Sequence, residues 1–326
     1  MRVTPACDSI NSFSISSAEG IQTDPDVTSD GTDYMVVWSD LRVDGNSTVY
    51  AARVTQEGVV LDPAGIQVGP ADGTLQKEPS IEFIGDKYFV VWGHLAAPFG
   101  VTGRFVSLDG SLGDTIHIAN SSAEVHNTAI AYDGNKMFVV WTEYPGLLRG
   151  QLVSTTGALI GSPFTIADEV LVVNSGNICF SGSEYFVIYN RMVGFILELW
   201  GRKYDASGNP MHSPFWITSP TQSSADGYVV AGDEYYLCVW SKLLYRADIY
   251  GNLDFNVGVE SNGSNVIVQK TPYTTVIISG PLLLPDDKKC VVVDITGRVV
   301  APDKILPGIY FVMSDNRVVQ KVIKAR

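Results

Sequence analysis

The sequence is poor in cysteine and in basic residues, and both shortages limit what the protein can be. Its four cysteines, at positions 7, 179, 238 and 290, form no Cys-x-x-Cys pair and no spacing typical of a metal site. The 22 basic residues stand against 35 acidic ones, so the net charge is −13. Nucleic acids and anionic membrane surfaces need clustered lysine and arginine, so neither is an expected partner.

Long apolar runs are also missing, and none reaches the about 18 residues that a membrane-spanning helix needs. The first 20 residues lack the basic start and apolar stretch of a signal peptide. This is consistent either with a cytoplasmic protein or with an exported one whose signal has been removed. The four histidines are scattered, and no Asp-x-Asp-x-Asp-Gly calcium loop occurs, so we expect neither a metal nor a cofactor.

One phrase is present five times, as an apolar run that ends in an aromatic residue. Its copies are DGTDYMVVWSD (30–40), GDKYFVVWGH (85–94), DGNKMFVVWTE (133–143), SGSEYFVIYN (181–190) and AGDEYYLCVWSK (231–242). The final Trp or Tyr of the run recurs after 54, 49, 48 and 51 residues. A period near 50, made only of short apolar runs and turns, predicts the blades of a β-propeller. The phrase also resembles the dGtnYlvvW repeats of secreted bacterial propellers.

Each repeat divides into four strands joined by tight turns such as Asp30-Gly31, and its tryptophan is expected to pack between neighbouring blades. The fifth repeat lacks its outer strands, whereas RVTPACDSINSFSIS (2–16) aligns with the outer strands of the first repeat. We therefore expect an all-β chain with a five-bladed propeller over residues 1–258, closed by its N-terminal outer strands. Residues 13–16 should then share a sheet with residues 235–240. A larger ring truncated at its N-terminus is the alternative.

The period stops near residue 261, and the chain that follows predicts a small antiparallel β-sandwich over residues 264–326. VVVDITGRVV (291–300), LPGIYFV (306–312) and VQKVIKAR (319–326) resemble the type A C-terminal sorting domain of the bacterial type IX secretion system. The usual opening Tyr-Pro-Asn-Pro of that family is absent. The resemblance implies recognition by the secretion machinery, a secreted or cell-surface location, and a signal peptide already removed. A generic small β-sandwich is the alternative.

Candidate ligand contacts come from the loops that surround the channel of a propeller on one face. These are the loops that enter the first strand of each blade and those that follow its second strand. Their polar residues are Asp24, Asp26, Asp40, Arg42, Glu78, His94, Glu124, His126, Glu143, Arg191, Asp226 and Lys242.

Three functions fit this outline. The first is a secreted, non-catalytic propeller that binds a polysaccharide or a protein, with Phe99, Tyr144 and Phe195 available to stack on sugar rings. The second is a glycoside hydrolase of the five-bladed, arabinanase-like type, which needs two carboxyl groups flanking the scissile bond. Acids are plentiful in the loops, but no family motif marks a catalytic pair. The third is a structural spacer within a surface protein.

Overall fold

The computed structural model describes residues 2–3, 9–43, 46–170, 176–193, 196–218, 223–232, 236–243, 247–254, 274–278, 282, 290–294, 298–306, 308–314 and 317–324. The chain forms two compact units, residues 1–260 and 261–326. In the described residues the regular structure is β-strand, apart from one 3-10 turn, η1 (Pro302–Lys304). No helix within these ranges has the length and apolar content to cross a membrane.

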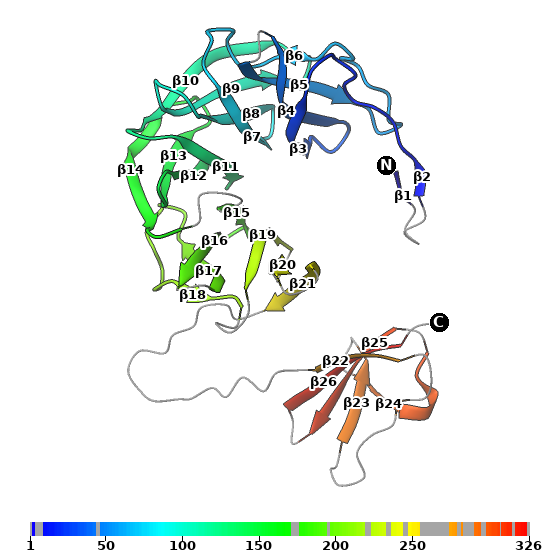
Figure 1. Cartoon of the computed structure of the whole chain (residues 1–326). Helices are drawn as coiled ribbons and strands as arrows, with labels where there is room; N and C mark the ends of the chain where they lie inside the picture. Colours follow the sequence, from blue (N-terminus) through cyan, green and yellow to red (C-terminus); the bar gives the residue numbers. More distant parts are fainter. Residues whose placement is uncertain are drawn as a thin grey trace. The chain divides into compact units, whose positions relative to one another are not determined.

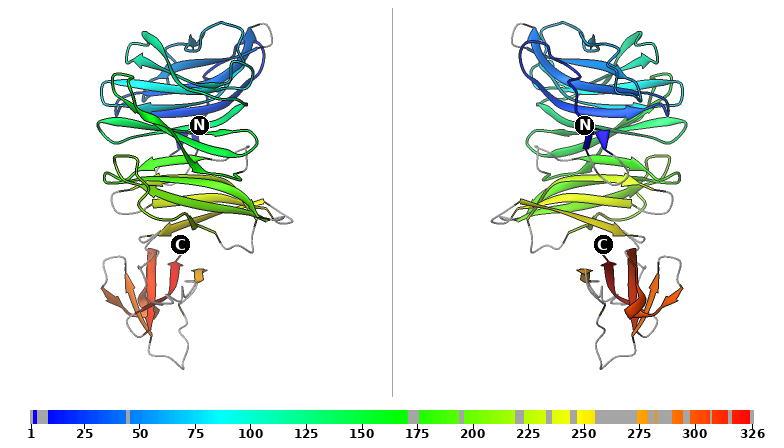
Figure 2. Two further views of the ribbon diagram at one scale, coloured as in Figure 1. Left: turned by 90° about the vertical axis from the view of Figure 1, so that its left-hand side faces the viewer. Right: turned by 90° about the vertical axis from the view of Figure 1, so that its right-hand side faces the viewer.

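Five antiparallel sheets follow one another along the first unit, one for each repeat, and the fold is propeller-like and all-β. Strands that are consecutive in the chain are paired within each sheet. The first strands of the sheets contact one another in chain order and lie on the inner side of the arc in Figure 1; Figure 2 shows the sheets stacked one on the next. The sheets are β3 (Gln22–Ser29), β4 (Tyr34–Val43), β5 (Asn46–Val54), β6 (Ile66–Gln67); β7 (Gln76–Phe83), β8 (Lys87–His94), β9 (Gly100–Ser107), β10 (Leu112–Asn120); β11 (Val125–Tyr132), β12 (Lys136–Glu143), β13 (Leu147–Ser154), β14 (Leu159–Ala167); β15 (Asn177–Phe180), β16 (Tyr185–Val193), β17 (Ile196–Tyr204), β18 (Phe215–Trp216); and β19 (Ser224–Ala231), β20 (Tyr236–Leu243), β21 (Ala247–Asp254).

In the first sheet, the turn between β3 and β4 depends on an aspartate followed by a glycine. Asp30 Oδ1 accepts hydrogen bonds from the backbone N–H groups of Thr32 and Asp33, each at 2.7 Å. Gly31 has a φ of +90°, which a side chain would strain. The predicted tight turn is confirmed here, and this turn sets the register in which the apolar second strand pairs with the inner strand.

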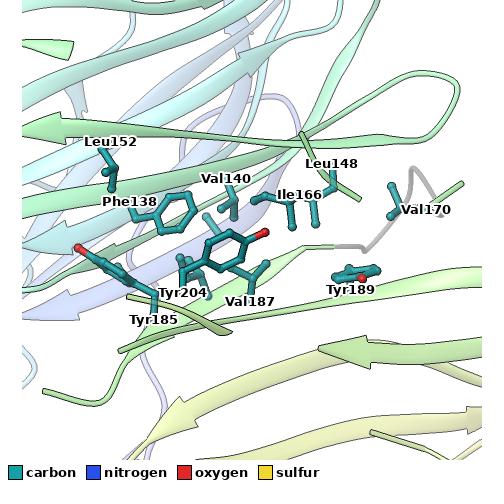
Figure 3. Close-up of a cluster of buried hydrophobic side chains, with 13 residues drawn as sticks. Phe138, Val140, Leu148, Leu152, Ile166, Val170, Tyr185, Val187, Tyr189 and Tyr204 are labelled. Carbon is teal, nitrogen blue, oxygen red and sulfur yellow. The ribbon is translucent and has the colours of Figure 1, made fainter. Parts of the chain in front are cut away.

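The core is distributed over the seams between neighbouring sheets. Trp92 of β8 is fully buried in a cluster with Val37 and Val49 of the preceding sheet, and Trp141 occupies the same position one sheet later. In the next seam the ring of Phe138 meets Tyr185 edge to face, with centroids 5.2 Å apart (Figure 3). The expected packing role of the tryptophans is confirmed in these seams.

Residues 13–16, which are expected to share a sheet with residues 235–240, are not paired with any strand in the described structure. The fifth sheet has three strands, β19 to β21, among the described residues, and residues 12–16 lie outside any strand. Phe13 and Ile15 pack instead against a cluster of the first sheet that includes Val54, because that cluster offers them a buried apolar surface. Upstream, β1 (Arg2–Val3) and β2 (Ser9–Asn11) form a small antiparallel hairpin.

The second unit contains one five-stranded sheet in the order β22-β26-β25-β23-β24. The strands β22 and β26, which are the first and last of this unit along the chain, pair in parallel. The expectation of purely antiparallel pairing is therefore wrong at this position. A parallel pair needs a long crossover connection, and here the other strands of the sheet provide it. The second layer of the expected sandwich is not among the described residues. The strands are β22 (Thr274–Ile278), β23 (Cys290–Asp294), β24 (Val299–Val300), β25 (Gly308–Ser314) and β26 (Arg317–Lys324).

Candidate functional site

The acid that follows the first tryptophan is held by neighbours in its own strand. Residues two apart in a strand share a face, and the indole N–H of Trp38 donates to Asp40 Oδ2 at 2.8 Å. The backbone and guanidinium of Arg42 also donate to this fully buried carboxylate. Burial opposes the charge, but the hydrogen bonds from Arg42 and Trp38 outweigh it and lower the pKa of Asp40. These contacts give Asp40 and Arg42 a structural task.

The same arrangement recurs in the third sheet and is broken in the second. The indole N–H of Trp141 donates to Glu143 Oε1 at 2.9 Å. In the second sheet the corresponding residue is His94, which is buried and contacts Thr102 Oγ1 through Nε2 at 2.9 Å. Both Nδ1 of His94 and the indole N–H of Trp92 are buried without a partner in the described part of the chain. Burial lowers the pKa of His94, so this imidazole is neutral at pH 7.

A bulge interrupts four inner strands close to the residues at which they begin. At each bulge a residue other than glycine has a left-handed backbone, with φ between +49° and +54°, and the register with the second strand shifts. The position in the fourth sheet lies outside the described residues. Such strained residues are frequent at functional sites. The four residues are Asp24, Glu78, Asn127 and Asp226.

Glu78 and two residues of the third sheet form a polar cluster. Nδ1 of His126 lies 3.6 Å from Glu78 Oε1, and its Nε2 lies 3.4 Å from Glu124 Oε2. Glu78 Oε2 also accepts a hydrogen bond from the backbone N–H of Asn127. Burial opposes the charge on Glu78, but His126 and this N–H outweigh it and lower the pKa of Glu78. The hydrogen bond to Glu78 raises the pKa of His126. The cluster therefore favours an imidazolium between two carboxylates.

A second acidic pair joins the inner strands of the first two sheets. Asp26 Oδ2 on β3 accepts hydrogen bonds from the hydroxyl of Ser80 and the backbone N–H of Ile81 on β7, both at 2.9 Å. The next residue along β7 is Glu82, which is half-buried like Asp26. Burial, and then the charge of Asp26, raise the pKa of Glu82 from 4.5 to about 7. Glu82 therefore keeps its proton up to about pH 7.

The remaining predicted residues are dispersed. Arg191 pairs with Glu169 at 2.8 Å, and its guanidinium lies over the ring of Trp200. Asp226 Oδ2 accepts a hydrogen bond from Ser241 at 2.9 Å. The side chain of Lys242 lies outside the described residues.

Of the three aromatic candidates, one is exposed. The ring of Tyr144 is 59% exposed, Phe99 is half-buried, and Phe195 lies outside the described residues. The backbone N–H of Tyr144 donates to the carbonyl of Glu124 at 3.0 Å, which joins the residue with the exposed ring to one acid of the polar cluster around His126. In the described ranges, no group of three or more His, Cys, Asp or Glu side chains is arranged to hold a metal ion.

Neither a protein-family model nor a curated protein matches this chain. The chain is similar to several solved structures. They include a GH43 endo-arabinanase from Bacillus licheniformis (13% identity, 73% of this chain and 95% of that chain, TM-score 0.44). An endo-arabinase from Bacteroides thetaiotaomicron has 11% identity over 76% of this chain and 98% of that one, with a TM-score of 0.49. An α-L-arabinofuranosidase from Podospora anserina has 7% identity over 68% and 84%, with a TM-score of 0.45.

Sequence reasoning included Asp26 among the candidates but missed Glu82. A signal for Glu82 was present in the alignment of the repeats. The other four inner strands have Thr28, Ala131, Cys179 or Val230 at the same position, so Glu82 is the one carboxyl group in this set. An acid at a position that is otherwise apolar or small indicates a special environment.

Proposed function

We propose that this protein is a glycoside hydrolase that uses Asp26 and Glu82, on the inner strands of the first two sheets. The observation that carries the proposal is the placement of these two carboxyl groups on adjacent inner strands, with Asp26 bonded to the residues immediately before Glu82. Glycoside hydrolysis needs one carboxylic acid that protonates the leaving oxygen and one carboxylate on the other side of the sugar.

The two environments assign the roles. Glu82 keeps its proton up to about pH 7, so it is the proton donor to the glycosidic oxygen. Asp26 accepts hydrogen bonds from two donors of the neighbouring sheet and from the N–H of Val27, which fix the position of its carboxyl group. It is placed to stabilise positive charge that develops on the sugar or to act on water.

The test is hydrolysis of a substrate panel of arabinan, galactan, cello-oligosaccharides and chromogenic glycosides. We expect the full chain to cleave at least one substrate and Glu82→Gln to lose at least about 100-fold in kcat. Asp86→Asn is the matched control, because Asp86 lies in the same sheet with 79% of its side chain exposed, and it should keep full activity. If no substrate is cleaved, or if Glu82→Gln is as active as the wild type, the proposal is wrong.

A second candidate is polysaccharide binding without cleavage, and the surroundings of Tyr144 favour it. An exposed tyrosine ring beside a carboxylate–imidazole cluster offers a stacking surface and hydrogen-bonding groups together. Under this function Tyr144→Ala should weaken binding of a polysaccharide about tenfold in calorimetry. Leu159→Ala, at an exposed apolar site on the third sheet, is the control. Binding that persists in Glu82→Gln but is lost in Tyr144→Ala would separate this function from catalysis.

We further propose that the five sheets are the blades of a five-bladed propeller and that residues 264–326 are a secretion sorting domain. In support, the motifs of the sorting-domain resemblance fall on strands: Asp294 ends β23, Tyr310 lies in β25, and Lys321 lies in β26. In a bacterium with type IX secretion, the full chain should reach the cell surface or the medium. A chain truncated after residue 260 should stay in the periplasm; if it is exported equally well, the sorting assignment is wrong.

A further inference from the structure

The first sheet has an apolar face that no other sheet covers in the described structure. Val27 on β3 is 56% exposed. In every other sheet the side chain at this position is packed against the preceding sheet and only 4–8% exposed. Those residues are Ile81, Ile130, Ile178 and Val229. Tyr34 on β4 is also exposed, whereas its counterpart Tyr88 is buried.

The fifth sheet has the complementary face, and that face is uncovered too. Leu237 on β20 is 40% exposed, whereas the residues at its position in the other four sheets are fully buried against the following sheet. Val230 and Tyr228 on β19 are exposed on the same sheet. The buried counterparts of Leu237 are Met35, Phe89, Phe138 and Phe186. The two ends of the series of sheets thus carry the two halves of one further seam.

The N-terminal segment already occupies part of this seam. A Cβ on Gly58, in the outer turn of the first sheet, would lie 2.9 Å from the ring of Phe13. The equivalent glycines of later sheets lie against the outer strand of the sheet before them: Gly110 against Ile66, and Gly157 against Ile116. Phe13 therefore sits on the first sheet where the outer strand of a preceding sheet would sit.

The register of the N-terminal hairpin agrees with this position. Val3 pairs with Ser9, and exactly 51 residues later Val54 pairs with Val60 in the first sheet. Phe13 contacts Gly58 as Ile66 contacts Gly110, so Phe13 and Ser14 correspond to Ile66 and Gln67 of the outer strand β6, which pairs with β5. The strand of the fifth sheet that corresponds to β5 is β21, and its outer edge has no partner strand in the described structure.

We propose that residues 13–17, which lie outside any strand in the described structure, become the fourth strand of the fifth sheet by pairing with β21, and that this strand joins the uncovered faces of the fifth and first sheets within one chain. Tyr50 pairs with Gln67 in the first sheet, and the same register places Ser14 opposite Tyr250. Closure buries both apolar faces and satisfies the free edge of β21, so each half of the seam stabilises the other. This inference concerns the scaffold and does not depend on catalysis.

The first test is a cross-link in the full chain. Ser14→Cys with Tyr250→Cys should form an intrachain disulfide under mild oxidation, identified by mass spectrometry of the linked peptides. Tyr50→Cys with Gln67→Cys, a pair joined in the first sheet, is the positive control, and Ser14→Cys with Thr165→Cys is the negative control. A disulfide between two chains would mean that a second copy supplies the strand. That result, or no cross-link at all, would overturn the proposal.

The second test uses two valines with the same exposed fraction. Val27 and Val59 are both 56% exposed, but the equivalents of Val59, Ala158 and Asn209, are exposed as well. Closure predicts that Val27→Asp lowers the Tm of the full chain by about 5–10 °C, whereas Val59→Asp changes it by less than about 2 °C. Equal effects of the two substitutions would show that the face around Val27 stays open to solvent and would contradict closure.

Discussion

The acids at the ends of the second strands and the acids on the inner strands differ in where their partners come from. Asp40 is bound by Trp38 and Arg42, each two residues away. Glu143 is bound by Trp141, again two residues away. The acid and the groups that donate hydrogen bonds to it lie in the same short stretch of strand. These contacts therefore do not depend on the other sheets.

The inner-strand acids depend on other sheets. Asp26 is bound by residues 54 and 55 positions away, and Glu78 by the backbone of a residue 49 positions away. The lowered pKa of Glu78 and the raised pKa of Glu82 both depend on the stacking of the sheets. Acids with local partners stabilise a strand, whereas acids with distant partners lie where neighbouring sheets meet, which is where we propose the catalytic pair.

The sharpest way to break this comparison is to remove one acid of each kind. Glu82→Gln should lower kcat on the active substrate by about 10²–10⁴-fold, because it removes a proton donor, without lowering the Tm at pH 7, because a neutral amide replaces a carboxyl group whose ionisation destabilises the folded chain. Glu143→Gln should leave kcat unchanged and lower the Tm, because it weakens the acceptor of the Trp141 indole. Steady-state kinetics and calorimetry on both variants decide it. An inactive, fully stable Glu143→Gln would contradict the division between the two sets.

A large effect on stability is expected at Asp40. Asp40→Ala leaves the buried indole N–H of Trp38 and the guanidinium of Arg42 without their acceptor, at a cost of about 3–5 kcal/mol in the free energy of unfolding. The exposed acid Asp86 provides the control, since Asp86→Ala should change this free energy by less than about 0.5 kcal/mol. Urea denaturation measures both. A loss below about 1 kcal/mol for Asp40→Ala would place Asp40 among the acids free to bind a ligand.

The five sheets could be predicted because the repeat carries its own evidence: a turn signal, an apolar run and a tryptophan at a constant spacing. The structural task of Asp40 could also have been predicted, since Trp38 and Asp40 are two residues apart and so share a face of the strand. The contacts of Asp26 with Ser80 and Ile81 could not, because they depend on how adjacent sheets stack. The parallel pairing of β22 with β26 likewise depends on the order of strands in space.

The comparison also predicts how stability depends on pH. The pKa of Glu82 is raised from 4.5 to about 7 in the folded protein, so between these values the folded chain holds a proton that the unfolded chain has released. Its contribution to stability is complete below about pH 4.5 and is lost as the pH rises to about 7, on the order of 3 kcal/mol. Unfolding free energies of the wild type and Glu82→Gln at several pH values test this. Equal pH slopes in the two proteins would contradict it.

The smallest effect is expected in the second sheet, where the tryptophan of the second strand has no acceptor two residues later. In the second sheet His94 stands where the first and third sheets have an acceptor for the tryptophan, and the N–H of Trp92 is buried without a partner among the described residues. His94→Gln supplies an amide oxygen for Trp92 and an amide N–H for Thr102. We expect this substitution to stabilise the protein by about 0.5–1.5 kcal/mol at pH 7.

The gain from His94→Gln should increase in acid. Burial lowers the pKa of His94 in the folded chain, so on acidification below about pH 6.5 the unfolded chain binds the proton first and the wild type loses stability. Glutamine does not titrate, so the difference between the two proteins should widen from pH 7 to pH 5. His117→Gln is the control, because His117 bonds to Asn120 in a more exposed setting. Urea denaturation at both pH values measures the difference, and a gain that shrinks in acid would mean that His94 is protonated in the folded protein.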